Sequence, residues 1–193
     1  MRVLNLCLGR TQPLLINGQA HASAIGKQPV AGPVAVGPLG LAGDEQADPS
    51  VHGGLAKAVY AYPSEHLPFW QTVRAQAGVA DWSAPVPPGL LGENLLIQGL
   101  TEDRLWIGDL LHVGGPDPAG CVLAVSEPRF PCFKFNHVMG FKQAARLMQQ
   151  SGYCGAYLAV RVPGSLQAGA TLRLEPGPRE VNLRELFRAR ARP

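Results

Sequence analysis

The sequence predicts a mainly β protein whose strands close, or nearly close, into a barrel. About eight segments have strand-like patterns, and only two helical segments are inserted among them. Strands and helices therefore do not alternate as they do in βαβ folds. The 193 residues include 23 glycines and 18 prolines, which favours a turn-rich chain. Closure into a barrel is economical because it removes exposed edge strands.

Each predicted strand is a short apolar or alternating run bounded by turn residues. In the first predicted strand, residues 2–9, every second residue from position 4 is a leucine, so the leucines would share one face of the strand. Gly108 and Asp109 mark a bend inside another. The remaining strand predictions are residues 14–16, 33–39, 57–62, 94–100, 104–114, 121–129, 155–162 and 170–175.

Two inserted helices and one terminal helix complete the prediction. Residues 64–78 form the first, which requires Pro68 to lie in its first turn. Residues 138–152 form the second, with apolar residues at helical spacing and Gly152 as its stop. We expect one β-barrel domain over residues 1–178 and a short basic tail over 179–193. In that tail, Asn182 is positioned to cap one short helix.

Composition and charge exclude several classes of function. The chain is 46% hydrophobic and 16% charged, as expected of a folded globular protein. Its formal charge of +3 comes entirely from the tail, so a broad nucleic-acid surface is not expected. No apolar run reaches membrane length without breaks. The cysteines form no C-x-x-C pair, so free thiols in a reducing cytoplasm are the simplest interpretation.

Unusual polar residues gather in three segments, each at the end of a predicted strand. They are the loop of residues 40–54 with the strand that follows, the pair at 93–94, and the stretch EPRFPCFKF at 127–135. Because strand ends gather at the rim of a barrel, we expect the three segments to meet there. Paired glycines after His52 can offer backbone N–H groups to an anion, and Lys57 can reach a phosphate. Histidine before two glycines also occurs in ordinary turns.

Cys132 is the strongest candidate for chemistry. Its stretch reads as the end of a strand, a proline-clamped turn and a return into strand. Pro128 and Pro131 restrict the backbone, and Arg129 can lower the pKa of the thiol and grip a phosphate or carboxylate. A fixed thiolate suits a thiophilic metal. We expect the other cysteines to be buried and structural; these are Cys7, Cys121 and Cys154.

The motifs together resemble the MOSC domain, named for the C-terminal domain of molybdenum-cofactor sulfurase, and its YiiM-like branch. They are SAIGKQPV, GLAGDEQADPSVHGGLAKAVYAYPSEH, GLLGENLLIQGL, IGDLLHVGG and SEPRFPCFKFN, in the order of the family. The resemblance implies a MOSC-type β barrel that binds the molybdenum–pterin cofactor, with Cys132 as catalytic residue and molybdenum ligand. The cofactor-binding residues that it implies are Lys27, His52, Lys57, Asn94 and Arg129.

The resemblance also implies an activity, the reduction of N-hydroxylated compounds such as hydroxylaminopurines. Electrons would come from an external electron-donor protein, since the sequence has no dinucleotide-binding fingerprint and no iron–sulfur cysteine cluster. Members of this branch often continue into a C-terminal helical unit, whereas this sequence ends at Pro193.

Three alternative functions stay open at this stage. They are a non-catalytic cofactor carrier, a sulfur-transfer protein with a persulfide on Cys132, and a thiol hydrolase using Cys132 and His52. A homodimer is an open assembly state.

Overall fold

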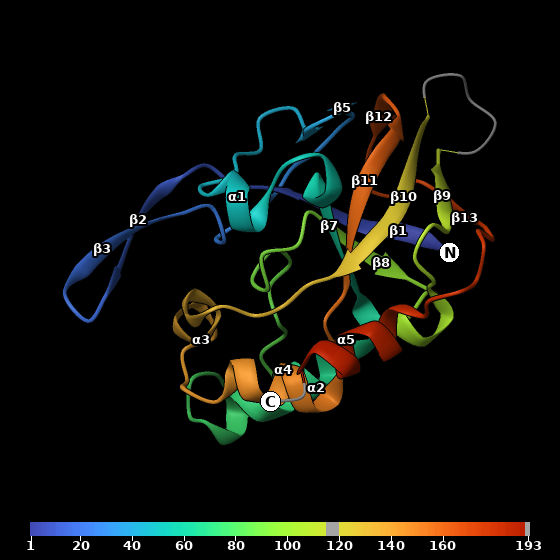
Figure 1. Cartoon of the computed structure of the whole chain (residues 1–193). Coiled ribbons are helices and arrows are strands. Elements are labelled where there is room, and N and C mark those ends of the chain that lie inside the picture. The colour runs from blue at the N-terminus through green and yellow to red at the C-terminus, as the bar shows by residue number, and fades with distance from the viewer. Residues whose placement is uncertain (115–119, 192–193) are drawn as a thin grey trace.

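A mixed eight-stranded sheet dominates the structure, which is a computed structural model describing residues 1–114 and 120–191, without the side chains of residues 50 and 51 (Figure 1). The strand order is β13-β9-β10-β11-β7-β8-β1-β4, in which β7 and β8 are parallel and the other pairs antiparallel. These strands are β1 (Arg2–Leu8), β4 (Gln28–Pro29), β7 (Val59–Pro63), β8 (Leu95–Gln98), β9 (Leu110–Val113), β10 (Cys121–Pro128), β11 (Ala156–Val162) and β13 (Leu172–Glu175).

Two smaller sheets complete the β structure. A three-stranded sheet has the order β12-β5-β6, and β2 pairs with β3 alone among the described strands. Their bounds are β2 (Gln12–Ile16), β3 (Gln19–Ser23), β5 (Val34–Gly37), β6 (Gly40–Leu41) and β12 (Gly164–Leu166). The prediction of a mainly β fold is therefore confirmed. The sequence analysis missed β3, although Asn17 and Gly18, both at positive φ, form the turn of this hairpin.

The large sheet is not a closed barrel in its strand pairing. Its end strands are β13 and β4, which do not pair with each other in the part of the chain that the structure describes. One bridge joins Arg2 to Thr171, and Val3 exchanges backbone hydrogen bonds with the segment just before β13. The expected closed barrel is thus not confirmed.

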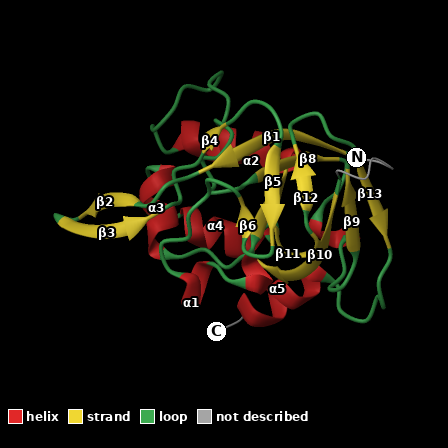
Figure 2. Cartoon of the chain, turned by 90° about the horizontal axis from the view of Figure 1, so that it is seen from above, coloured by secondary structure: helices red, strands yellow, loops and turns green. Residues whose placement is uncertain are grey.

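Four of the helices, α2 to α5, gather below the large sheet in Figure 1, whereas α1 lies apart from them near β2 and β5; Figure 2 shows the same molecule from above. The helices are α1 (Pro49–His52), α2 (Leu67–Gln76), α3 (Phe133–Met139), α4 (Ala144–Ser151) and α5 (Leu183–Ala191), with short 3₁₀ turns η1 (Leu55–Lys57), η2 (Ser64–His66) and η3 (Glu102–Arg104). Among the described residues, no helix has the length and apolar character needed to cross a membrane.

Two helix predictions need correction. The chain does not return into strand after Cys132, because this residue is the extended N-cap of α3 and the apolar side chains that follow have helical spacing. The single helix expected over 138–152 is instead split, since Gly140 at φ 83° ends α3 before α4 begins. The terminal helix has the expected cap, in which Asn182 Oδ1 accepts from the N–H groups of Arg184 and Glu185.

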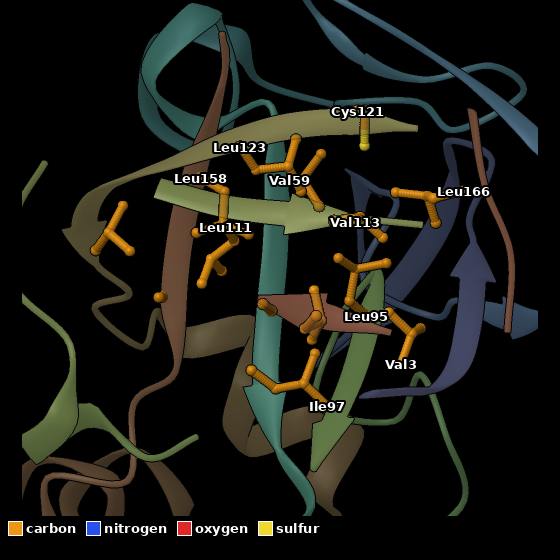
Figure 3. Close-up of a cluster of buried hydrophobic side chains, with 14 of the residues drawn as sticks. Val3, Val59, Leu95, Ile97, Leu111, Val113, Cys121, Leu123, Leu158 and Leu166 are labelled. Atoms are coloured by element: carbon orange, nitrogen blue, oxygen red, sulfur yellow. The ribbon is translucent and has the colours of Figure 1, made fainter. Parts of the chain in front are cut away.

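Alternating side chains on the central strands separate two cores. Val59 and Ala61 of β7 face the aliphatic core inside the large sheet, which also contains Cys121 (Figure 3). Tyr60 and Tyr62 face the second, aromatic core, which the helices cover. Because both faces of β7 are buried, its tyrosine hydroxyls need polar partners inside the protein. The Tyr60 hydroxyl donates to the Cys154 carbonyl and the Tyr62 hydroxyl to the Tyr153 carbonyl.

Candidate functional site

The three polar segments of the sequence meet at one cavity. It encloses about 670 Å³ of empty space when its open mouth to solvent is counted. The end of β10, the loop before β7 and the start of β8 all contribute to its wall. Every residue predicted to bind the cofactor or metal lines it; these are Lys27, His52, Lys57, Asn94, Arg129 and Cys132. Their roles toward a ligand stay predictions.

Cys132 differs from the other three cysteines, as expected. All four are free thiols, but Cys132 is half-buried and lines the cavity, whereas Cys7, Cys121 and Cys154 are buried. Burial alone would raise the pKa of the Cys132 thiol. A hydrogen bond with His52, the charges of His52 and Arg129, and a backbone N–H at Lys134 outweigh this effect and lower the pKa to about 7. A substantial thiolate fraction therefore faces the cavity at neutral pH.

Burial has the opposite result at the structural cysteines. It raises the pKa of Cys7 to about 12 and that of Cys121 to about 11, and it raises the pKa of Cys154 strongly. These thiols stay protonated at physiological pH. Cys132 is thus the one cysteine of the chain that is placed for nucleophilic or metal chemistry.

Arg129 is a buried cation without a carboxylate partner among the described residues. Its side chain is 4% exposed and lies between the rings of Tyr60 and Phe135, at 5.1 and 4.8 Å from their centroids. One nitrogen contacts the sulfur of Met148 at 3.9 Å. Burial would lower its pKa, but negative charge on Tyr60, Tyr157 or Cys132 raises it.

Of these three groups, only Cys132 is ionised to a large extent at neutral pH. Burial raises the pKa values of Tyr60 and Tyr157, so both hydroxyls stay neutral. Burial also raises the pKa of Glu93, a carboxyl group whose charge acts on Arg129, to about 7, so Glu93 too is only partly ionised at neutral pH. Arg129 therefore lies among groups that are neutral or partly ionised at this pH.

His52 and Tyr157 form a polar pair in the cavity wall. His52 Nδ1 lies 3.4 Å from the Tyr157 hydroxyl, and both residues line the cavity. The Tyr60 hydroxyl is turned away and donates to the carbonyl of Cys154 at 2.8 Å. The His52–Tyr157 pair can therefore hold a proton next to the Cys132 thiolate.

On a second part of the cavity wall, Lys27 and Asp44 compensate each other's charge. Lys27 Nζ donates to Asp44 Oδ1 at 2.5 Å, with side chains only 8% and 5% exposed. Asp44 also accepts from the Gly9 N–H at 2.7 Å and from Asn94 Nδ2 at 2.9 Å. Asn94 in turn accepts from the Tyr60 N–H. Because the polar atoms of the Asn94 side chain have partners within the protein, it acts on the cavity by positioning Asp44.

The two glycines after His52 serve a contact within the protein. A side chain at Gly53 would collide with Gln46, and the Gly54 N–H donates to Gln46 Oε1 at 2.9 Å. Gly54 has φ 80°, which favours glycine. The expected use of the Gly54 N–H for an anion is therefore not what the structure displays. Lys57 lies 3.7 Å from Glu127, so its charge is partly balanced.

Sequence reasoning missed the roles of Asp44, Tyr60, Tyr157 and Lys134, which all line the cavity. The two tyrosines are in largely apolar strands, and this pattern is that of core positions. Asp44 stood out as a polar loop residue, but its partner Lys27 is distant in the sequence. Lys134 was visible as the second cation beside Cys132.

Comparisons with known proteins agree with this arrangement. Residues 48–173 match the model of the MOSC domain. The chain is 39% identical over 172 residues to the uncharacterized protein YflK of Bacillus subtilis, covering 89% of this chain and 72% of that one. It is 38% identical over 168 residues to the protein YiiM of Escherichia coli, covering 86% and 70%. A protein named reductase from Gibberella moniliformis is 33% identical over 97% of this chain, which spans only 32% of that protein.

Solved structures give the same result. The crystal structure of YiiM from Geobacillus stearothermophilus superposes with a TM-score of 0.74 at 29% identity, covering 98% of this chain and 83% of that one. YiiM from Escherichia coli superposes with a TM-score of 0.69 at 29% identity, covering 97% and 76%. The similarity thus extends over the arrangement of elements that builds the cavity.

Proposed function

We propose, from the premise that the chain belongs to the MOSC domain family as a YiiM-like protein, that it is a molybdenum-cofactor-binding oxidoreductase. Its proposed reaction is the reduction of N-hydroxylated compounds such as hydroxylaminopurines. The observation that supports this most is Arg129, a buried cation that lines the same cavity as the Cys132 thiolate. A buried cation without a carboxylate partner is costly unless an anion binds to it.

The residues present fit this cofactor. The described part of the chain contains no group of three or more His, Cys, Asp or Glu side chains able to hold a metal ion by itself. The cavity instead offers a single thiolate, so a metal bound there must bring most of its ligands with it. A molybdenum–pterin cofactor does so. Cys132 would hold the metal, and Arg129 would face the anionic groups of the cofactor.

Reductive cleavage of an N–O bond consumes two electrons and two protons and releases an amine and water. When bound, the cofactor supplies the two-electron redox change. The chain holds a proton near the reacting atoms, at His52 Nδ1 or the Tyr157 hydroxyl. The four cysteines provide no iron–sulfur site, so we propose that the electrons come from a separate donor protein. Free thiols favour a reducing compartment such as the cytoplasm.

The experiment compares the wild type with Cys132→Ala after expression in a host that makes the cofactor. We expect bound molybdenum and reduction of a hydroxylaminopurine, with a donor reductase supplied, in the wild type only. Cys121→Ala is the matched control, because Cys121 is also a free thiol but lies in the aliphatic core (Figure 3). Equal molybdenum in the wild type and Cys132→Ala would rule out the ligand role. Molybdenum without turnover would indicate a cofactor carrier.

A second candidate function is sulfur transfer. The half-buried Cys132 thiol with a pKa of about 7 favours it, because a thiolate that can reach solvent can accept and pass on sulfane sulfur. This function predicts cyanide-releasable sulfur on the metal-free wild type and none on Cys132→Ala. The molybdoenzyme proposal predicts no such sulfur on either form.

A further inference from the structure

Glu93 is a buried carboxyl group that the proposed reaction does not use. Its side chain is 0% exposed, although Gly92 and Asn94 on either side of it both line the cavity. Glu93 Oε1 accepts from the Gly89 N–H at 2.6 Å. Glu93 Oε2 is also buried but has no hydrogen-bond partner among the described residues. A buried carboxylate with an unpartnered oxygen is costly, and the uptake of a proton removes its charge.

The chain holds Glu93 next to Tyr60, whose ring contacts Arg129. The Asn94 N–H donates to the Tyr60 carbonyl at 2.8 Å, and Asn94 Oδ1 accepts from the Tyr60 N–H at 3.0 Å. The Arg129 guanidinium lies 5.1 Å from the centroid of the Tyr60 ring. Its charge acts on Glu93 and favours the carboxylate, although Oε2 makes no hydrogen bond to it. The two groups therefore interact by charge across the interior of the protein.

Three ionisable groups interact electrostatically with Glu93. They are Cys7 of β1, Tyr60 of β7 and Arg129, which directly follows β10. Burial raises the pKa of Cys7 to about 12 and that of Tyr60 strongly, so both are neutral at physiological pH. Arg129 is the charged member of the three. Burial outweighs its influence and raises the pKa of Glu93 to about 7, where a modest change in nearby charge alters the protonation of this group.

We propose that Glu93 takes up a proton from solvent, at Oε2, when an anion binds at Arg129. The inference rests on the proposed function, because it takes Arg129 as the group that binds the anion. An anion beside Arg129 cancels the positive charge that favours the Glu93 carboxylate, and its own negative charge disfavours the carboxylate further. One negative charge thus replaces another: the carboxylate compensates Arg129 in the empty site, and the anion compensates it in the filled site.

Anion binding at Arg129 should therefore weaken as the pH rises through about 7. Below that pH Glu93 already holds its proton, so the anion meets no carboxylate. Above it the proton has to be taken up from a solution that contains fewer protons. Because the filled site binds one proton more than the empty site, each pH unit above the pKa should lower the affinity by about tenfold.

The test is the affinity of the metal-free protein for sulfate, measured by calorimetry at about pH 6 and about pH 8 and at constant ionic strength. Sulfate is the probe because its charge is constant over this range. Glu93→Gln keeps an oxygen acceptor for the Gly89 N–H and imitates the protonated carboxyl group. We expect Glu93→Gln to bind sulfate about tenfold more tightly than the wild type at the higher pH, and equally at the lower pH. Cys132 and His52 are present in both forms, so their titration affects both alike.

Glu45→Gln is the matched control. Glu45 also lines the cavity, but its hydrogen bond with the Thr11 N–H lowers its pKa, so it is ionised at both pH values. Its removal should change the sulfate affinity by the same factor at both. Arg129→Met should lose most of the sulfate binding at either pH, which assigns the bound sulfate to Arg129.

An affinity ratio between Glu93→Gln and the wild type that is the same at both pH values would overturn the proposal. So would a wild type that binds no sulfate, or an Arg129→Met variant that binds it equally well. Should Glu93→Gln not fold, as judged by circular dichroism, the wild type provides a second measurement. Its infrared absorption from protonated carboxyl groups should grow when sulfate is added at about pH 8, and a constant absorption would contradict the uptake of a proton by Glu93.

The proposed function can fail separately, because neither measurement uses molybdenum. Proton-coupled sulfate binding in a protein that retains no molybdenum would leave the role of Glu93 intact and count against the proposed function. Molybdenum retention together with an affinity ratio that does not depend on pH would count against Glu93 alone.

Discussion

The two walls of the cavity contain similar residues but treat their charges differently. On one wall Lys27 is paired with Asp44, whose carboxylate accepts two further hydrogen bonds. On the other wall Arg129 is equally buried but has aromatic rings, a thioether and a thiolate as neighbours. Lys27 thus has a carboxylate in direct contact, whereas Arg129 has none among the described residues.

This difference shows that a cation in a sequence motif is not necessarily a positive charge for the ligand. Lys27 and Arg129 are both expected to bind the cofactor on the basis of resemblance. The contacts assign Lys27 to holding the loop that contains Asp44, and they leave Arg129 available for an anion. The two residues should therefore respond in opposite ways when their charges are removed.

The largest effect is expected from Lys27→Met. The substitution leaves the Asp44 carboxylate buried without its counter-charge, which costs about 3–5 kcal/mol of unfolding free energy. Urea denaturation of the metal-free protein measures this loss. Adding Asp44→Asn should recover most of it, because the uncompensated charge is then gone.

Lys57→Met is the matched control for that prediction. Lys57 also lines the cavity and lies near a carboxylate, but it is 23% exposed and 3.7 Å from Glu127. Its removal should change the unfolding free energy by less than about 1 kcal/mol. Equal losses in the two variants would contradict the distinction between the walls.

The second prediction concerns Arg129→Met, which should weaken binding while leaving the fold intact. Arg129 has no carboxylate partner among the described residues that the substitution would leave unpaired, so the midpoint of thermal unfolding should change little. Retention of molybdenum should fall by about tenfold to a hundredfold, the cost of losing a charged hydrogen-bond donor. Metal content after stepwise dilution measures this effect.

Arg129→Lys keeps the charge but not the planar fork, so it should retain more metal than Arg129→Met. If Arg129→Met instead lost several kcal/mol of stability and kept its molybdenum, the residue would be structural, like Lys27. Both cations would then stabilise the fold, and neither would be available for a ligand.

The sequence was sufficient to predict the mainly β fold and the meeting of three polar segments, because strand ends and turn residues are local signals. Asn182 is an instructive success, since a helix cap depends only on residues within the next turn. The hairpin of β2 and β3 was missed although Asn17 and Gly18 are a strong local signal for a hairpin turn.

The different roles of Lys27 and Arg129 were not predictable from the sequence. They depend on which side chains of distant segments face each other, as Lys27 and Asp44 do, and no periodicity encodes that pairing. The helix that begins after Cys132 was missed because the two prolines before it suggested an extended return. The split at Gly140 shows that a glycine within a helical pattern can end one helix and allow a second.

The third and smallest effect concerns the titration of Cys132. Its pKa of about 7 lies below the ordinary 9.0, so the thiolate fraction should increase as the pH rises through about 7. The alkylation rate of the metal-free protein by iodoacetamide, followed by mass spectrometry, should therefore reach half its maximum at that pH. His52→Ala removes the hydrogen bond that lowers this pKa and should move the midpoint upward by roughly one pH unit.

Lys27→Arg is the control for this titration, because it keeps the charge on the opposite, compensated wall and should leave the midpoint where it is in the wild type. A wild-type midpoint near 9 would mean that the positive charges of the second wall do not act on the sulfur. The uncompensated wall would then lack the electrostatic property that distinguishes it. A midpoint near 7 that His52→Ala does not move would instead assign the lowered pKa to Arg129 and to the Lys134 N–H, the remaining groups that favour the thiolate.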